Sequence, residues 1–178
     1  MTASPSPSTG PTLALVGATG RFAEAIVSAL ALRDDRWGDI RLLAPGVTTR
    51  TLGVRGREQQ IEVLREDSFE GVDVTLFNLP SEQTKAWTRR AVESGAVVVD
   101  ASSAHRLDED VPLVVPGIND AALADRPAGI VADRALGDVK RAVADAVWQR
   151  LAIDRQARML RLGEDRHNGI ETGRNFDA

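Results

Sequence analysis

The sequence has 178 residues, of which 43% are hydrophobic and 27% charged, as in ordinary globular proteins. A formal net charge of -4 argues against a nucleic-acid partner, and no apolar run approaches the ~20 residues of a membrane helix. The sequence has no cysteine and only two histidines, far apart, which excludes disulfides and a cysteine nucleophile and predicts no metal site.

The chain starts with residues 1–12, rich in Pro, Ser and Thr, which we interpret as a flexible leader without a secretory signal, so we expect a cytoplasmic protein. The apolar run at 13–16 predicts a strand. Residues 21–32 predict a helix, and its apolar face is formed by Phe22, Ile26, Ala29 and Leu30.

The turn between this strand and this helix contains Gly17 and Gly20. Such a turn lets backbone N–H groups approach a phosphate at the N-terminus of the helix. In a dinucleotide site Gly17 would form the tight turn, Gly20 would admit the pyrophosphate, and Ala23 would allow close packing. The alternative is an inherited turn in a fold that binds nothing, and the residues leave both open.

Strands and helices then alternate along the chain. Strands are predicted at 40–44, 72–77, 96–100, 111–115 and 129–132, with a hairpin of 51–55 and 60–64 about Gly56-Arg57. A helix is predicted at 82–94, with Ser81 as its N-cap and Gly95 just beyond its end. The continuous apolar run at 96–100 is typical of a buried parallel strand. The order predicts an α/β, Rossmann-like, doubly wound and mostly parallel sheet in a single domain.

The last apolar pattern predicts a helix that closes the core. Its residues recur at three- and four-residue spacing, and they are Val139, Ala142, Val143, Ala146, Val147 and Leu151. We therefore expect a domain at 13–152 closed by a helix at 138–151, followed by a helical extension and flexible tail at 153–178.

Several motifs follow one another in a recognisable order. They are Leu-Val-Gly-Ala-Thr-Gly at 15–20, Ile-Arg-Leu-Leu-Ala at 40–44, residues 67–77, residues 91–100, Ser-Ser-Ala-His-Arg at 102–106 and residues 110–116. In this order they resemble the N-terminal NADP-binding domain of aspartate-semialdehyde dehydrogenases. The similarity extends over roughly residues 12–133.

This resemblance implies a cofactor site, which we predict to bind NADP weakly or no dinucleotide at all. Its residues would be Gly17, Thr19, Gly20, Arg21 and Phe22. Where the family has a Ser/Arg loop against the adenosine 2′-phosphate, this chain offers Arg50 and two threonines. Where the family has a small, glycine-rich turn beside the nicotinamide, this chain has Asn78-Leu79-Pro80-Ser81. We therefore expect Leu79 to intrude on the space of the cofactor.

The family's acylating thiol follows the strand at 129–132 in an Asn-Pro-Asn-Cys segment. Here the segment reads Asp133-Arg134-Ala135-Leu136, so no catalytic residue is predicted and the covalent route is closed. Because the helix at 138–151 resembles the family's C-terminal helix, we expect the intervening catalytic domain to be missing.

The segment 102–106 holds the remaining candidates. The resemblance makes Arg106, with Ser103, an anchor for a phosphate or carboxylate. The alternative that we favour is a loop arginine paired with Asp108 or Glu109. His105 lies close to serines in the sequence, but no elbow motif supports a hydrolytic triad.

Three alternative functions are compatible with these sequence features. The first is a non-catalytic protein, a pseudoenzyme of this family, that acts as a binding or regulatory partner; exposed apolar surface would be covered by a protein partner or by self-association. The second is an enzyme repurposed around Ser102, His105 and Arg106. The third is an NADP-dependent semialdehyde reductase that is active only with a partner subunit. No nucleic acid or membrane partner is expected.

Overall fold

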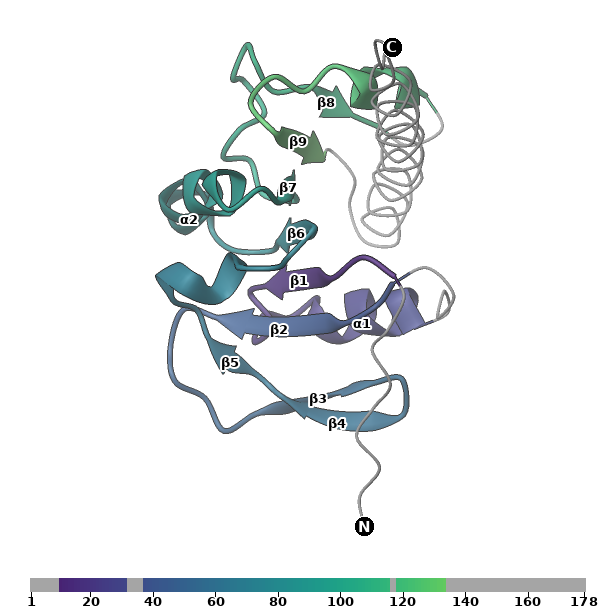
Figure 1. Ribbon diagram of the computed structural model, residues 1–178, viewed down its shortest axis with the longest axis vertical. Helices are drawn as coiled ribbons and strands as arrows, with labels where there is room; N and C mark the ends of the chain where they lie inside the picture. The colour runs from purple at the N-terminus through teal and green to yellow at the C-terminus, as the bar shows by residue number, and fades with distance from the viewer. Residues whose placement is uncertain (1–9, 32–36, 116–117, 134–178) are drawn as a thin grey trace, which may run out of the picture.

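A computed structural model describes residues 10–31, 37–115 and 118–133. Within them, seven strands form one sheet in the order β5-β2-β1-β6-β7-β9-β8, and every neighbouring pair is parallel (Figure 1). The strands are β1 (Leu13–Val16), β2 (Ile40–Ala44), β5 (Glu62–Val63), β6 (Val74–Phe77), β7 (Val97–Asp100), β8 (Leu113–Val114) and β9 (Ile130–Asp133). The predicted Rossmann-like α/β fold is confirmed.

The α-helices of the described residues are α1 (Ala23–Ala31) and α2 (Ser81–Glu93). They cover opposite faces of the sheet. Neighbouring residues of a strand point to opposite faces, so their contacts show which helix covers which face. Leu15 packs in one buried cluster with Ile26 of α1, whereas Val16 packs in another with Ala91 of α2. A central strand buried on both faces explains the continuous apolar runs in the sequence.

The direction of strand order reverses at β1. From β1 the chain passes to β2 on one side and later crosses to β6 on the other side. In a parallel sheet the carboxyl ends of all strands meet at one edge, and the reversal opens a crevice there in which ligands bind. Gly17 follows β1 and Asn78 follows β6 at this point, so the predicted glycine turn lies at the crevice.

The hairpin differs from its prediction. β3 (Thr51–Val54) and β4 (Arg57–Gln60) are antiparallel, and the turn is Arg55-Gly56, with φ values of 52° and 73° as a two-residue hairpin turn requires. The predicted pairing of 51–55 with 60–64 is wrong, although the short strand β5 lies within 60–64. The chain leaves the hairpin after β4, and β5 pairs with β2, because this pairing satisfies backbone groups along the edge of the main sheet.

The start of α2 also differs from its prediction. Ser81 is the first helical residue rather than the N-cap, because its Oγ is hydrogen-bonded to Ser103 Oγ at 2.8 Å. Gly95 follows the helix end with a φ of 89°, as predicted. Two short 3-10 helices, η1 (Glu66–Phe69) and η2 (Asp120–Ala124), were not predicted.

The end of the predicted leader is joined to the sheet. The amide of Thr12 donates to Asp73 Oδ2 at 2.9 Å, and the carbonyl of Pro11 accepts from the Gly38 amide. The earlier leader residues, the predicted helix at 138–151 and the tail at 153–178 lie outside the described residues. No helix among those described is long and apolar enough to cross a membrane.

Candidate functional site

The first glycine of the turn is fixed by its surroundings. Gly17 has a φ of 97°, and a Cβ added to it would lie 2.4 Å from the backbone oxygen of Asn78. A side chain therefore meets both a disfavoured conformation and rigid backbone. The Gly17 and Ala18 amides both donate to the Leu43 carbonyl, at 2.8 and 3.0 Å, so the turn is tied to β2.

The next part of the turn presents backbone donors at the N-terminus of α1. The amide of Gly20 donates to the Gly17 carbonyl and that of Ala23 to the Gly20 carbonyl, each at 3.0 Å. Within the described part of the chain, the amides of Thr19 and Arg21 have no hydrogen-bond partner. N–H groups at such a position are the ones that bind a phosphate.

Arg50 joins this turn from the loop that follows β2. Its Nη1 donates to the Thr19 carbonyl at 2.8 Å, and its Nη2 lies 3.7 Å from Glu24 Oε1. The side chain is 51% exposed, so its charge faces solvent beside the turn.

Phe22, in the turn before α1, is 43% exposed, and the Arg21 guanidinium lies 5.2 Å from the centre of its ring. The prediction that Phe22 belongs to the buried helix face is therefore wrong.

The segment after β6 packs directly on the two glycines. Leu79 Cδ2 lies 3.0 Å from the position that a Cβ on Gly17 would take, and its intrusion on a cofactor stays a prediction. Asn78 Nδ2 lies 3.2 Å from the corresponding position on Gly20. This contact of Asn78 was not predicted, although its place directly after a predicted strand was a usable signal.

Asp100, at the end of β7, holds the loop that carries the other candidates. It is 0% exposed. Its Oδ1 accepts the Ser102 amide at 2.7 Å and its Oδ2 accepts the His105 amide at 3.2 Å. This places Ser103 against Ser81. The role of Asp100 was missed, although an Asp followed two residues later by Ser is a signal for an Asx turn.

His105 is committed to structural contacts. It is 8% exposed, its Nε2 is hydrogen-bonded to Thr88 Oγ1 at 3.0 Å, and its Nδ1 is hydrogen-bonded to Asp108 Oδ2 at 2.7 Å. Both ring nitrogens are thus occupied, and neither is placed to activate Ser102 or Ser103. The arrangement does not form a hydrolytic triad.

Arg106 does not form the predicted ion pair. Asp108 binds His105 instead, and among residues 10–31, 37–115 and 118–133 neither Asp108 nor Glu109 pairs with Arg106. The Nε of Arg106 is buried without a hydrogen-bond partner. The favoured interpretation of a paired loop arginine is therefore wrong, and the cation is left available for an anion.

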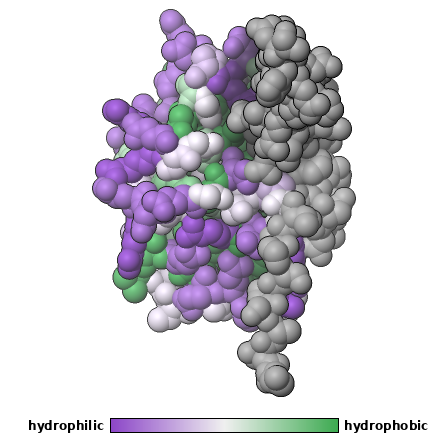
Figure 2. All heavy atoms as spheres, viewed as in Figure 1, coloured by the Kyte–Doolittle hydropathy of each residue, from purple (hydrophilic) through white to green (hydrophobic). Residues whose placement is uncertain are grey.

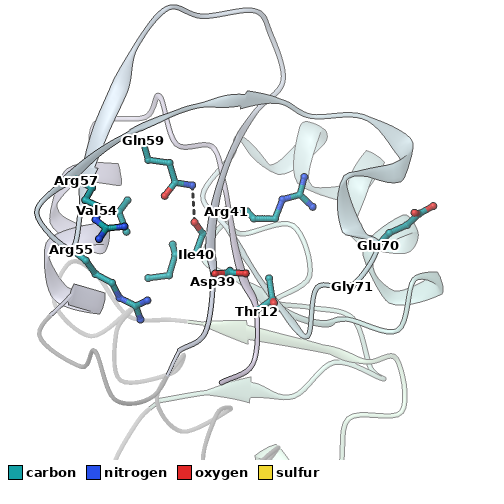
Figure 3. Close-up of a pocket in the computed structure, with 10 residues that line it drawn as sticks. All are labelled: Thr12, Asp39, Ile40, Arg41, Val54, Arg55, Arg57, Gln59, Glu70 and Gly71. Atoms are coloured by element: carbon teal, nitrogen blue, oxygen red, sulfur yellow. Dashed lines mark hydrogen bonds between the residues drawn. The ribbon is translucent and has the colours of Figure 1, made fainter. Parts of the chain in front are cut away.

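A cavity lies at the amino edge of the sheet, opposite the glycine turn (Figure 3). This cavity of about 720 Å³ is lined by Thr12, Asp39, Ile40, Arg41, Val54, Arg55, Arg57, Gln59, Glu70 and Gly71. Arg41 is held by Glu62 at 2.6 Å, and Arg55 donates to the carbonyls of Trp37 and Gly38 at 2.7 and 2.8 Å. No local pattern indicates this cavity, because separate segments of the chain form its walls.

The described surface is mainly polar on the face that Figure 2 shows, with apolar residues in smaller, separate areas. The exposed large apolar side chains among the described residues are Phe22, Val47, Leu107 and Ile118. No group of three potential metal ligands occurs within the described ranges. A partner-covered surface stays a prediction.

The family comparison agrees with this geometry. A sequence model described as "Semialdehyde dehydrogenase, NAD binding domain" matches residues 12–126. The chain is 34% identical to the aspartate-semialdehyde dehydrogenase of Aquifex aeolicus over 135 residues, and 35% identical to that of Bacillus subtilis over 122 residues. These matches cover 74% and 68% of this chain but only 40% and 35% of the relatives, so the chain spans well under half of their length.

Solved structures show the same relationship. Aspartate semialdehyde dehydrogenase II from Vibrio cholerae, complexed with ASA, superposes with a TM-score of 0.65 at 31% identity, covering 70% of this chain and 42% of that one. The Candida albicans enzyme with NADP superposes with a TM-score of 0.53 at 18% identity, over 70% of this chain and 42% of that one. The latter likeness concerns the fold alone.

Proposed function

The chain belongs to the semialdehyde dehydrogenase family through its NAD binding domain, and we propose that it is a non-catalytic member that binds a nucleotide and acts as a binding or regulatory partner. The observation that carries this proposal is the glycine turn after β1, where the direction of strand order reverses. The amides of Thr19 and Arg21, which have no partner among the described residues, lie at the N-terminus of α1, and Arg50 is hydrogen-bonded to the Thr19 carbonyl beside them. Amides and a guanidinium in this arrangement suit the phosphates of a nucleotide.

NADP is the dinucleotide that this half of the site favours. A site for NAD uses an acidic residue near the end of the second strand, which accepts hydrogen bonds from the ribose hydroxyls. Here β2 ends at Ala44, and Arg50 is the charged side chain that its loop brings to the turn. A guanidinium attracts the 2′-phosphate that distinguishes NADP from NAD.

The family's covalent chemistry lacks its nucleophile in this chain. Acyl transfer through the enzyme needs a thiolate, and the 178 residues contain no cysteine. Leu136 stands where the resemblance places the thiol. His105 does not replace it, because Thr88 and Asp108 occupy its ring nitrogens.

The test is NADPH absorbance with the purified chain and either aspartyl phosphate or aspartate semialdehyde. We expect no turnover above a heat-killed control. Leu136→Cys should not restore activity, because a nucleophile without its general base is inadequate. Turnover by the unmodified chain would refute the non-catalytic proposal.

One observation favours a second candidate, a reductase that acts with a partner subunit. Arg106 has a buried Nε without a hydrogen-bond partner, at the position of the family's phosphate or carboxylate anchor. A partner that supplied a thiol could use this arginine to hold an acidic substrate. Turnover by a complex purified from the native host, with none by the isolated chain and a loss in Arg106→Ala, would support this candidate over the first.

A further inference from the structure

The two halves of the crevice differ in what occupies them. A doubly wound sheet binds a dinucleotide across the point where its strand order reverses, with one mononucleotide on each side. In this chain the β1–α1–β2 side would take the adenosine half, since it carries the glycine turn and Arg50. The β6–α2–β7 side would take the nicotinamide half.

The adenosine side presents hydrogen-bond donors. The Thr19 and Arg21 amides are free within the described residues, and Arg50 is oriented by its 2.8 Å hydrogen bond to the Thr19 carbonyl. The contact of Arg50 with Glu24 is long, at 3.7 Å, and both side chains are exposed. Exposed ion pairs of this kind contribute little, so a phosphate can compete for the guanidinium.

The nicotinamide side begins with an apolar side chain that lies on the turn. Leu79 Cδ2 is 3.0 Å from the position of a Cβ on Gly17, and Leu79 also packs against the buried cluster beneath α2. The next residue, Pro80, has a fixed φ of -56° and precedes the helix directly. Pro80 therefore restricts the backbone of Leu79.

One further contact lies on the same side. Ser81 Oγ and Ser103 Oγ are hydrogen-bonded at 2.8 Å, which joins the loops after β6 and β7. A nicotinamide ribose entering here would have to displace an apolar side chain and separate these loops.

We propose that the site takes only the adenosine half of NADP, so that its ligand class is an adenosine nucleotide with a 2′-phosphate. The inference rests on the proposed function, because it assigns a narrower ligand to the same site. The 2′-phosphate meets Arg50, the 5′-phosphate meets the amides of Thr19 and Arg21, and Leu79 excludes the nicotinamide half.

The experiment is calorimetric titration of the full chain with NADP+, adenosine 2′,5′-bisphosphate, adenosine 5′-monophosphate and nicotinamide mononucleotide. We expect NADP+ and the bisphosphate to bind with Kd values within about threefold of each other, because the nicotinamide half adds no contact. The 5′-monophosphate should bind more weakly, and nicotinamide mononucleotide should not bind.

A variant tests the role of Leu79 directly. Leu79→Ala should tighten NADP+ binding by about tenfold and leave the bisphosphate unchanged, since it removes a large side chain from one half only. Leu107→Ala is the matched control, because Leu107 is an exposed leucine elsewhere on the described surface. It should change neither ligand.

The outcomes separate the two proposals. If NADP+ binds the unmodified chain more than about tenfold tighter than the bisphosphate, the inference is overturned while the proposed nucleotide binding stands. If Leu79→Ala leaves the ratio of the two affinities unchanged, the assigned role of Leu79 is overturned. If no adenosine ligand binds, the proposed nucleotide binding fails as well.

Discussion

Replacing Asp100 with alanine should destabilise the fold through the loop that carries Ser103 and Arg106. The carboxylate is fully buried and accepts the amides of Ser102 and His105 at 2.7 and 3.2 Å. Alanine leaves both donors without their partner, at about 1–3 kcal/mol each, so the expected loss is about 2–6 kcal/mol. Asp100→Asn should lose less, because its amide oxygen still accepts one of the two bonds.

Thermal and urea unfolding followed by circular dichroism would measure this loss. A domain of this size shifts by about 2–4 °C per kcal/mol, so Asp100→Ala should lower the Tm by ~4 °C or more. Asp110→Ala is the control, because Asp110 is exposed on the same loop and bonds through its side chain to no described residue. If the two variants agree within about 0.5 kcal/mol, the carboxylate does not hold the loop and the reasoning is wrong.

Other expectations concern the turn and the chain beyond β9. Gly17→Ala should lower the free energy of unfolding by at least ~2 kcal/mol, because it combines a φ of 97° with a backbone atom 2.4 Å from the new Cβ. Gly46→Ala, whose Cβ would meet nothing within 4 Å, should be nearly neutral in the same thermal melt. A chain ended after Asp133 should not fold cooperatively, because burying each large apolar residue of 138–151 contributes roughly 1.5–3 kcal/mol, whereas a chain ended after Gly163 should melt like the full length. A cooperative melt of the shorter chain near the full-length Tm would contradict the closing-helix prediction.

Local physics was enough for most of the strands, for α1 and α2, and for the position of the turn. Short apolar runs mark strands buried on both faces, and spacing of three and four marks helices, so the alternating α/β order follows from neighbouring residues alone. Gly17 was predictable for the same reason, since a strand that must turn sharply into a helix needs a residue that tolerates positive φ.

Residues far apart in the sequence decided what the site can hold. Arg50 reaches the Thr19 carbonyl across 31 positions, and Asn78 lies against Gly20 only because β6 is the neighbour of β1. Ser81 was expected to cap its helix from local pattern, yet its hydroxyl bonds to Ser103. Hydrogen bonds and side-chain contacts of this kind depend on strand order, which local periodicity does not encode. The sequence by itself therefore determined the fold and the glycine turn, and only the tertiary structure decided that Arg50 and Leu79 lie against that turn.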